Sequence, residues 1–433
     1  MLKKTKIVCT LGPASKDEKT MKAMLEAGMN VARLNFSHGT HEGHRKTIET
    51  FRKVRDELGV PAAVLLDTKG PEIRVGDFEN GSEMLEAGDT FVLTSEKCMG
   101  TAQRADTTYK ALPTQVEAGT VILIDDGRIR MEVTDTTDTD VICRVISGGK
   151  ISNRKGVNIP NKSLDLEYIS EADRSDILFG IEMDVDYVAA SFVRSGDDVR
   201  ALRKLLNDNG GEKIKIISKI ENTEGIANFA EILDLSDGIM VARGDMGVEV
   251  DFEKLPGIQK KFIKECCRAG KPVITATQML ESMTTSTSPT RAEITDVANA
   301  VFDGTSAVML SGESAAGMFP VETVQAMAKI VHQAEIDAEE VNQYKFLEVE
   351  SDEKDIANAI GHAACTTAKD IKAKAIIAVT TSGYTAEMMS KYKPVEKIIA
   401  ATPVEKTYHQ QSLTRGVFPV LTDFSSDWDA LMV

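Results

Sequence analysis

The stretch Lys215–Ile–Ile–Ser–Lys219–Ile–Glu221–Asn222 carries a lysine and a glutamate inside an otherwise apolar segment. Its isoleucines predict a buried strand, because β-branched apolar side chains favour the interior of a sheet. Side chains alternate along a strand, so Lys219 and Glu221 point to the same face. Charges at the end of a buried strand need a partner. That partner is either the opposite charge, in a structural ion pair, or a metal or ligand, in a functional site.

Short apolar runs of this kind alternate with helical segments along most of the chain. Three runs precede residue 70 and five follow residue 168. The later runs start 24 to 34 residues apart, which is the length of one βα unit. Eight such units predict an α/β fold of the (β/α)₈ TIM-barrel type rather than an open doubly wound sheet. The expected strands are 6–12, 30–36, 61–67, 186–192, 215–221, 238–243, 271–277 and 306–311.

Two capping boxes mark expected helix starts beside these strands. The first covers residues 15–18, and apolar residues at helical spacing follow it until Gly28 ends the helix. The second covers residues 170–173, where the βα rhythm resumes.

Residues 70–168 interrupt the rhythm with a stretch rich in Gly, Thr and Asp that lacks helical periodicity. Its short apolar runs predict an inserted all-β domain, with hairpin turns at 125–127 and 147–149. A domain joined by two crossings is a candidate hinged lid, and a merely structural appendage is the alternative.

The last part of the chain predicts a C-terminal α/β domain. A helix is expected over 354–367 and strands over 375–380, 398–402 and 417–421. The loop 380–385 combines hydroxyl side chains with a glycine before a helix, which suits either a phosphate cradle or a plain capped turn. The expected division is 1–69 and 169–338 for the barrel, 70–168 for the inserted lid and 339–433 for a C-terminal regulatory domain whose end is incomplete.

Composition excludes several classes of protein. The 433 residues are 42% hydrophobic and 27% charged, as in an ordinary soluble protein. A net charge of −16 argues against general binding to nucleic acid or to an anionic membrane. We expect no signal peptide and no spanning segment. The six cysteines show no C-x-x-C spacing, which favours free thiols and a cytoplasmic location over a zinc site.

Polar and charged residues cluster where the predicted strands end, the edge at which TIM barrels carry their active sites. Glu221 and Asp245 form a sparse pair of carboxylates of the kind that Mg²⁺ prefers. Lys219 is a fixed positive charge suited to a transferring phosphoryl group, and Gly244 allows close approach of a ligand. Further phosphate contacts are expected from Arg33, Arg74 and Lys155, and a hard monovalent cation suits the oxygens of Asn35, Ser37, Asp67 and Thr68.

A histidine-rich run, Ser37–His–Gly–Thr–His41–Glu–Gly–His44, offers a zinc site as an alternative. Because the run lies in a loop and at a helix start, we disfavour that alternative.

Eight motifs, in order, give the chain a resemblance to pyruvate kinase over essentially all 433 positions. Each motif alone is weak, but eight in this order are highly specific. They are Cys9–Thr–Leu–Gly–Pro–Ala–Ser15, Ala32–Arg–Leu–Asn–Phe–Ser–His–Gly39, Asp67–Thr–Lys–Gly–Pro–Glu–Ile–Arg74, Lys155–Gly–Val–Asn158, Ile217–Ser–Lys–Ile–Glu–Asn222, Val241–Ala–Arg–Gly–Asp245, Thr275–Ala–Thr–Gln–Met–Leu–Glu–Ser282 and Met309–Leu–Ser–Gly–Glu313.

The resemblance implies transfer of the phosphoryl group of phosphoenolpyruvate to ADP, which gives pyruvate and ATP in glycolysis. It implies that Lys219 stabilises the migrating group and that Thr277 lies where the enolate is protonated. It also implies substrate contacts from Arg33, Gly244 and Asp245. The implied nucleotide contacts are Asn35, Phe36, Ser37, His38, Arg74 and Lys155. The implied metal ligands are Glu221 and Asp245 for Mg²⁺ (or Mn²⁺), and Asn35, Ser37, Asp67 and Thr68 for K⁺.

Three further expectations depend on the resemblance. Members that dispense with K⁺ carry a lysine where this chain has Glu72, so we expect K⁺ dependence. A homotetramer is implied, with a sugar-phosphate or nucleotide effector in the C-terminal domain. The family's third domain normally continues beyond the equivalent of Val433, so we expect weak or absent activation by a sugar phosphate.

The sequence also departs from the family pattern in two places. Ser286–Thr–Ser–Pro–Thr–Arg–Ala–Glu293 replaces the usual Asn–Pro–Arg–Pro–Thr–Arg–Ala–Glu, which puts the rigidity of that loop in doubt. Asn161 stands where glycine usually follows Pro160, near the expected lid hinge.

Two alternatives belong to other functional classes. One is a Mg²⁺-dependent lyase or aldolase that acts on pyruvate enolate in the same barrel, which would not need Lys155 or Arg74. The other is a non-catalytic metabolite-binding relative, which the complete set of expected catalytic positions disfavours.

Overall fold

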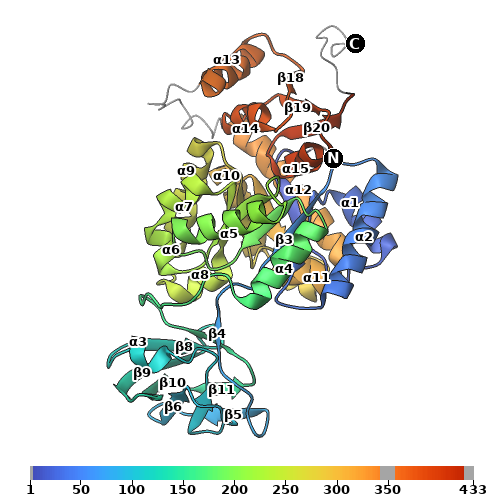
Figure 1. The fold of residues 1–433 in the computed structure, drawn as a ribbon. Coiled ribbons are helices and arrows are strands. Elements are labelled where there is room, and N and C mark those ends of the chain that lie inside the picture. Colours follow the sequence, from blue (N-terminus) through green and yellow to red (C-terminus); the bar gives the residue numbers. More distant parts are fainter. Residues whose placement is uncertain (1–2, 342–355, 424–433) are drawn as a thin grey trace.

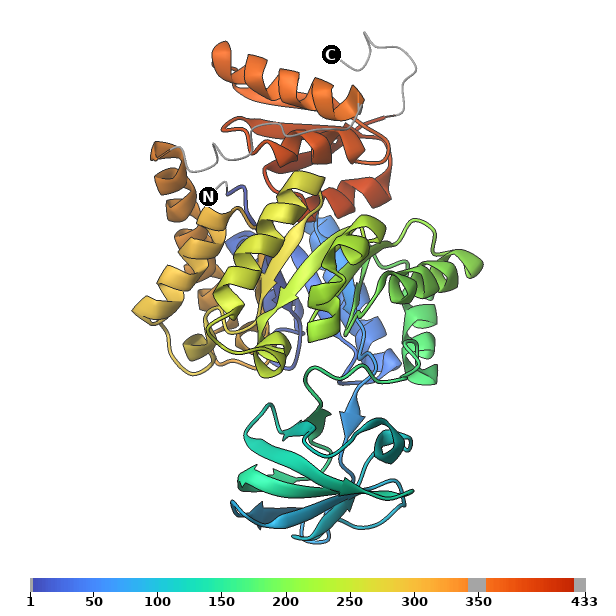
Figure 2. The same cartoon turned by 90° about the vertical axis from the view of Figure 1, so that its left-hand side faces the viewer.

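The computed structural model describes residues 3–341 and 356–423. The beginning of the helix expected at 354 and the last ten residues, which include Trp428, lie outside these ranges. Figure 1 shows three bodies in a row, with the barrel between the inserted β-domain and the C-terminal domain. The turned view in Figure 2 shows the same arrangement, so the β-domain and the C-terminal domain lie at opposite ends.

Eight parallel strands of the described residues close into a barrel, in the order β1-β17-β16-β15-β14-β13-β3-β2. The prediction of a TIM barrel is therefore confirmed. The strands are β1 (Lys6–Thr10), β2 (Val31–Asn35), β3 (Ala63–Asp67), β13 (Tyr187–Ala190), β14 (Lys215–Ile220), β15 (Gly238–Ala242), β16 (Val273–Ala276) and β17 (Ala307–Leu310).

Helices surround the barrel and cover the outward side chains of its strands. They are α1 (Glu18–Ala27), α2 (His41–Leu58), α4 (Glu171–Glu182), α5 (Gly196–Asp208), α6 (Thr223–Ala227), α7 (Phe229–Leu235), α8 (Arg243–Glu249), α9 (Leu255–Ala269), α10 (Arg291–Asp303), α11 (Gly312–Ala315) and α12 (Pro320–Glu340), with a 3₁₀ turn η1 (Glu281–Thr284).

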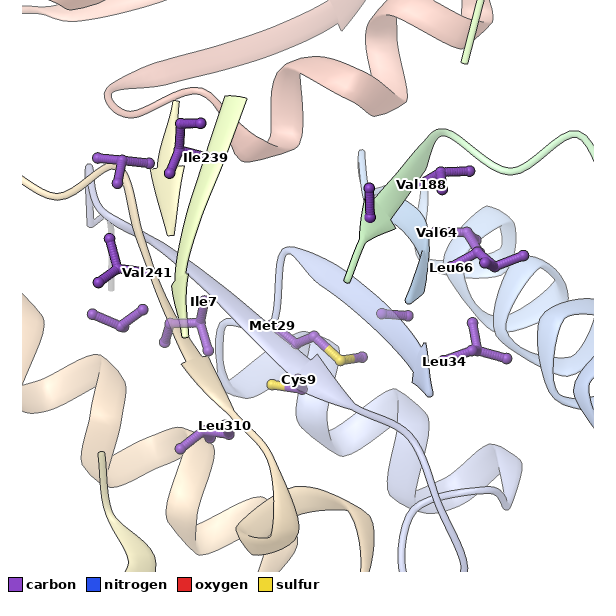
Figure 3. Packing of buried hydrophobic residues seen from close by; sticks show 14 of the residues in the cluster. Ile7, Cys9, Met29, Leu34, Val64, Leu66, Val188, Ile239, Val241 and Leu310 are labelled. Carbon is purple, nitrogen blue, oxygen red and sulfur yellow. The ribbon is translucent and has the colours of Figure 1, made fainter. Parts of the chain in front are cut away.

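Side-chain alternation along the strands produces two apolar layers. The outward layer packs against the helices, and Figure 3 shows part of it, including Val64 and Leu66 of β3 and Ile239 of β15. The inward residues of β3 are Ala63 and Leu65, which belong to the cluster inside the barrel. The next inward residue of β3 is Asp67, so the apolar interior gives way to charge at the carboxyl ends of the strands.

One of the two expected capping boxes is wrong. Helix α1 begins after Asp17, whose side chain accepts a hydrogen bond from Thr20 N at 3.0 Å. Ser15 Oγ instead accepts from Gly12 N at 3.1 Å, because the buried Ser15 side chain closes the turn after β1. At the second site the prediction of the helix start is confirmed, since Ser170 caps α4 by accepting from Asp173 N.

The inserted domain is built mostly from antiparallel strands, with β6 and β7 parallel, and has a single short helix, α3 (Leu112–Gln115), among its described residues. Its main sheet has the order β4-β12-β8-β9-β10-β6-β7, and β11 pairs with β5 beside it. The strands are β4 (Ile73–Arg74), β5 (Ser82–Leu85), β6 (Thr90–Thr94), β7 (Arg104–Asp106), β8 (Val121–Ile124), β9 (Ile129–Thr136), β10 (Asp140–Ser147), β11 (Gly149–Ser152) and β12 (Gly156–Asn158).

The first predicted hairpin turn, at 125–127, is confirmed because it joins the antiparallel pair β8 and β9. The second, at 147–149, is wrong, since β11 leaves β10 and pairs with β5. Gly148 makes this crossing possible: a Cβ there would lie 2.1 Å from Leu85 O. The chain therefore passes too close to the neighbouring backbone for any other residue.

The C-terminal domain contains a parallel sheet of order β18-β19-β20 in its described residues. Its elements are α13 (Ile356–Asp370), β18 (Ala375–Val379), α14 (Tyr384–Lys391), β19 (Lys397–Thr402), α15 (Glu405–Gln410), η3 (Gln411–Leu413) and β20 (Val417–Leu421).

This domain closes the barrel at the end opposite to the charged rim. Leu413 belongs to the apolar cluster inside the barrel and is fully buried. Beside it, Tyr187 of β13 donates its hydroxyl proton to Gln410 O at 2.6 Å, and Gln410 Nε2 donates to Asp186 O at 3.1 Å. Leu413 thus plugs the amino-terminal mouth of the barrel. No helix among the described residues is both long and apolar enough to cross a membrane.

We predict that Leu413→Ala lowers the free energy of unfolding by about 2 to 4 kcal/mol, because it leaves a cavity against the inner layer of the barrel. Urea unfolding followed by circular dichroism measures the change. Leu421→Ala is the matched control, since Leu421 is 51% exposed on β20. Equal effects of the two substitutions would contradict the role of Leu413 as a plug.

Candidate functional site

A buried charge cluster lies at the carboxyl ends of β2, β3 and β14. Lys219 Nζ lies 3.0 Å from Asp67 Oδ1 and 3.0 Å from Glu221 Oε1. Arg33 Nε donates to Asp67 Oδ2 at 2.6 Å, and Arg33 Nη1 donates to Thr10 Oγ1 at 2.8 Å. The ion pair between Lys219 and Glu221 that the sequence left open therefore exists, but Lys219 shares it with Asp67.

Burial and charge act in opposite directions on this cluster. Burial lowers the pKa of Lys219, but the charges of Asp67 and Glu221 outweigh burial and hold its pKa above the ordinary value. Burial likewise raises the pKa of Asp67, and Arg33 and Lys219 together outweigh it, so the pKa of Asp67 is lowered. Both groups therefore stay charged at neutral pH.

Glu221 is the least satisfied member of the cluster. Burial raises the pKa of Glu221 to about 7, against the opposing charge of Lys219. Its Oε2 accepts from Phe192 N at 2.6 Å, but its buried Oε1 has no hydrogen-bond partner despite the electrostatic contact with Lys219. A buried carboxylate oxygen without a hydrogen bond is suited to a metal ion.

Asp245 is the second carboxylate that the sequence assigned to this metal. It lies in the first turn of α8, directly after the strand β15 that neighbours β14, and it lines a cleft at the rim. Two oxygen ligands from two neighbouring strands leave positions open for water and substrate, as Mg²⁺ requires. The residues present therefore fit a divalent cation. No group of three or more His, Cys, Asp or Glu in the described part of the chain has the geometry of a metal site, which disfavours the zinc alternative.

Thr277 is held in a strained conformation beside Gly244. Its φ is 67°, a left-handed value that is rare for a β-branched residue. Its hydroxyl donates to Ala276 O at 2.6 Å and accepts from Gly244 N at 2.8 Å. The amide of Gly244, a residue expected to contact the substrate, is thus engaged by Thr277 in this structure.

Arg243, a residue without a predicted role, fixes the backbone around Thr277. Its guanidinium donates to Ala276 O at 3.1 Å and to Thr277 O at 2.6 Å. Asp296 of α10 anchors the same guanidinium at 2.7 Å. The signal in the sequence was an arginine directly before Gly244–Asp245 at the end of a predicted strand. Its partner Asp296 could not be predicted, because it lies more than fifty residues further along the chain.

The residues assigned to K⁺ lie at or just after the ends of the neighbouring strands β2 and β3, and two of their side-chain oxygens accept hydrogen bonds from backbone amides. Asn35 pairs in register with Asp67, and Asn35 Oδ1 accepts from Ser37 N at 3.1 Å. Thr68 Oγ1 accepts from Ser191 N at 3.1 Å. Asp67, which lies opposite Asn35 and directly before Thr68, stays ionised, so hard oxygen donors are present where a monovalent cation was expected.

A cleft of about 520 Å³ separates the barrel rim from the inserted domain. It brings together four of the expected site residues, which come from both bodies: His38, Arg74, Lys155 and Asp245. The two expected nucleotide contacts from the inserted domain, Arg74 and Lys155, are paired with carboxylates of that domain. Arg74 makes two hydrogen bonds of 2.7 Å to Glu72, and Lys155 Nζ lies 2.7 Å from Asp125 Oδ1.

Phe36 is placed differently from the other expected nucleotide contacts. Its ring stacks on His44 with 4.1 Å between centroids and packs against the outer core. The ring therefore supports the loop that follows β2, and His44 Nε2 contacts the same loop at His38 O, 2.8 Å away. His41 contacts Asp176 of α4 at 2.6 Å.

The loop 380–385 of the C-terminal domain has the geometry of a capped turn. Gly383 adopts a φ of 88°, and its amide donates to Thr380 Oγ1 at 2.9 Å. Thr407 Oγ1 donates to Thr381 O at 2.7 Å, which ties the loop to α15. Because the loop precedes α14, its amides lie at the amino terminus of that helix, which is the end that favours anions. The hypothesis that the loop binds a phosphate group stays a prediction.

A closed (β/α)₈ barrel with charged strand ends facing an inserted domain across a cleft defines a class of barrel enzymes that handle anionic substrates. Comparison with known proteins narrows the class. Residues 2–324 match the family model "Pyruvate kinase, barrel domain" and residues 358–433 match "Pyruvate kinase, alpha/beta domain". The chain therefore belongs to the pyruvate kinase family.

Named relatives agree over the whole chain. The chain is 48% identical to pyruvate kinase of Clostridium acetobutylicum, covering 100% of this chain and 91% of that one. It is also 48% identical to pyruvate kinase of Staphylococcus aureus, covering 100% of this chain and 74% of the relative. A crystal structure of a pyruvate kinase from Cryptosporidium parvum matches with a TM-score of 0.95 at 41% identity, over 99% of this chain and 89% of that one. The protein is a phosphotransferase of glycolysis, and the lyase or aldolase alternative is not favoured.

We predict that Arg243→Lys lowers kcat about tenfold or more, because one ammonium cannot replace a guanidinium that holds two carbonyl groups and Asp296 together. Steady-state kinetics measure the change. Arg203→Lys is the matched control, since Arg203 also joins a carbonyl, Ile214 O, to an aspartate, Asp237, far from the rim. Equal losses in both variants would contradict a specific role for Arg243.

Proposed function

We propose that the charged rim transfers the phosphoryl group of phosphoenolpyruvate to ADP, with Lys219 as the group that stabilises the migrating phosphoryl. The observation that carries this proposal is the position of the Lys219 ammonium, buried between Asp67 and Glu221 and permanently charged. A fixed charge in a site shielded from water stabilises developing negative charge without reorganisation.

The substrate contacts follow from the same rim. Arg33 is oriented by Asp67 and Thr10 and would contact the phosphate group. The amides of Gly244 and Asp245 would bind the substrate carboxylate, which requires Gly244 N to leave Thr277 Oγ1. Thr277 would then be free to assist protonation of the enolate through water. Thr277 is the second proposed catalytic residue, and its contact with Gly244 N beside the rim supports that role.

Two metal sites complete the proposed machinery. Glu221 and Asp245 would hold Mg²⁺ or Mn²⁺, which supplies charge stabilisation to the enolate and phosphoryl oxygens when bound. Asn35, Ser37, Asp67 and Thr68 would hold K⁺. Glu221 Oε1 lies 3.0 Å from Lys219 Nζ, so Glu221 would contact both the divalent cation and the ammonium that stabilises the phosphoryl group.

The nucleotide would enter the cleft between rim and lid. Closure of the lid would bring Arg74 and Lys155 to the phosphates of ADP, in exchange for their present partners Glu72 and Asp125. The proposed nucleotide contacts are Asn35, Phe36, Ser37, His38, Arg74 and Lys155.

We also propose the higher-order features that the family implies. The chain is divided into barrel (1–69 and 169–338), lid (70–168) and C-terminal domain (339–433), and it assembles as a homotetramer. The loop 380–385 is the proposed contact for a sugar-phosphate or nucleotide effector. A glycolytic reaction places the enzyme in the cytoplasm.

A coupled assay tests the function. We predict that pyruvate forms from phosphoenolpyruvate only when ADP and Mg²⁺ are present, and that replacing K⁺ by tetramethylammonium lowers the rate by about tenfold or more. The large cation cannot be coordinated by the oxygens near Asp67. Pyruvate formation without ADP would favour a lyase or phosphatase, and an unchanged rate in tetramethylammonium would refute the K⁺ site.

We predict that Lys219→Met lowers phosphoryl transfer about a thousandfold, the cost of losing a charge that acts on the transition state. Isotope exchange into pyruvate should remain measurable, because the proposed metal ligands and Thr277 are unchanged. Pyruvate formation and proton exchange are measured on the same preparation. Loss of both rates together with a large drop in melting temperature would favour a purely structural ion pair.

A further inference from the structure

Ser191 follows β13 directly and contacts the same lysine that the mechanism uses. Ala190 pairs in register with Ser218, so Ser191 and Lys219 come next on neighbouring strands. The Ser191 side chain is buried, and its hydroxyl accepts a hydrogen bond from Lys219 Nζ at 2.7 Å. This distance is shorter than the 3.0 Å contacts of Lys219 Nζ with Asp67 and Glu221.

The Ser191 hydroxyl donates its own proton to the first crossing into the lid. Ser191 Oγ lies 2.6 Å from Thr68 O and 3.3 Å from Asp67 Oδ1. The shorter contact with the carbonyl directs the hydroxyl proton to Thr68. Since a hydroxyl has one proton to donate, its lone pairs remain for Lys219.

The backbone of Ser191 contacts the same crossing. Ser191 N donates to Thr68 Oγ1 at 3.1 Å. Gly70 adopts a φ of 76°, and a Cβ there would lie 2.8 Å from Ser191 Cβ and 3.0 Å from Ser191 O. Asp173 of α4 holds Gly70 N from the other side at 3.0 Å, just after the chain returns from the lid. Ser191 therefore touches the hinge of the inserted domain and the rim at once.

We propose that Ser191 is a positioning residue, whose hydroxyl fixes the ammonium of Lys219 in the phosphoryl-transfer position and ties it to the lid hinge at Thr68 and Gly70. The inference rests on the proposed role of Lys219. A lysine has a flexible four-carbon stem, and its point charge is not directional. The two carboxylates supply charge, whereas Ser191 is a neutral acceptor that selects one position between them.

A structural role alone would give a different pattern. If Ser191 only satisfied the buried carbonyl of Thr68, its loss would reduce stability and all partial reactions together. If Ser191 positions Lys219, its loss reduces the step that needs the ammonium and spares the step that does not. The phosphoryl-transfer and proton-exchange rates separate these two cases.

The test uses Ser191→Ala in the full-length enzyme, with Ser218→Ala as the matched control. Ser218 is fully buried on β14, and its hydroxyl contacts Ser236 Oγ at 2.6 Å rather than Lys219. Both substitutions delete one buried serine hydroxyl from adjacent strands. Pyruvate formation is measured by the coupled assay. Isotope exchange into pyruvate is measured with Mg²⁺, K⁺ and inorganic phosphate, and the melting temperature of each variant is recorded.

We expect Ser191→Ala to lower kcat for pyruvate formation about 10- to 100-fold, the effect of one hydrogen bond to a charged group. Isotope exchange should change less than about threefold, and Ser218→Ala should leave both rates within that range. Equal loss of both rates in Ser191→Ala, or an unchanged kcat, would overturn the inference. Failure of the wild-type enzyme to form pyruvate would instead reject the proposed function.

A second variant keeps the proposal testable if Ser191→Ala does not fold. Ser191→Cys keeps the shape of the side chain with a slightly larger atom in place of the hydroxyl oxygen, and it offers Lys219 only a weak sulfur acceptor. A folded Ser191→Cys enzyme with wild-type kcat would overturn the inference, and a selective loss of phosphoryl transfer would support it.

Discussion

The contact between Lys219 and Asp67 is the constraint on which the rim depends. A buried lysine loses its charge unless neighbouring carboxylates compensate for desolvation, and here Asp67 and Glu221 do so. Arg33 makes the same compensation for Asp67. Lys219 and Asp67 therefore each keep their charge because of their charged neighbours. This interdependence keeps Lys219 charged while leaving one oxygen of Glu221 without a hydrogen bond.

The barrel supplies the rigid frame that such a cluster needs. The inward residues in the middle of the barrel are apolar, and those at the carboxyl ends of several strands are polar, so one strand carries both the core and the site. On β3 this change occurs between Leu65 and Asp67, and on β14 between Ile217 and Lys219. Leu413 fills the opposite mouth, which links the C-terminal domain to the same inner layer.

The number of barrel strands, the barrel class, the inserted β-domain and the start of α4 could be predicted because they depend on local sequence patterns. The wrong predictions, one helix cap and one hairpin turn, arose where the chain forms a contact other than the one that its local sequence suggests. Ser15 closes a turn instead of capping α1, and β11 pairs with β5 because only Gly148 allows the chain to pass Leu85. Ser191 was overlooked because the fourth strand offers no charged residue at its end.

The sequence by itself determined which residue types stand at each strand end, since two-residue alternation and the βα period place them at one rim. Only the tertiary structure decided which side chains contact each other at that rim. Lys219 contacts Asp67 and Ser191 from strands that are distant in sequence, and Arg243 depends on Asp296 of α10. Periodicity is a local property of the chain, whereas a buried charge is satisfied by whichever group the closed barrel brings within hydrogen-bond distance.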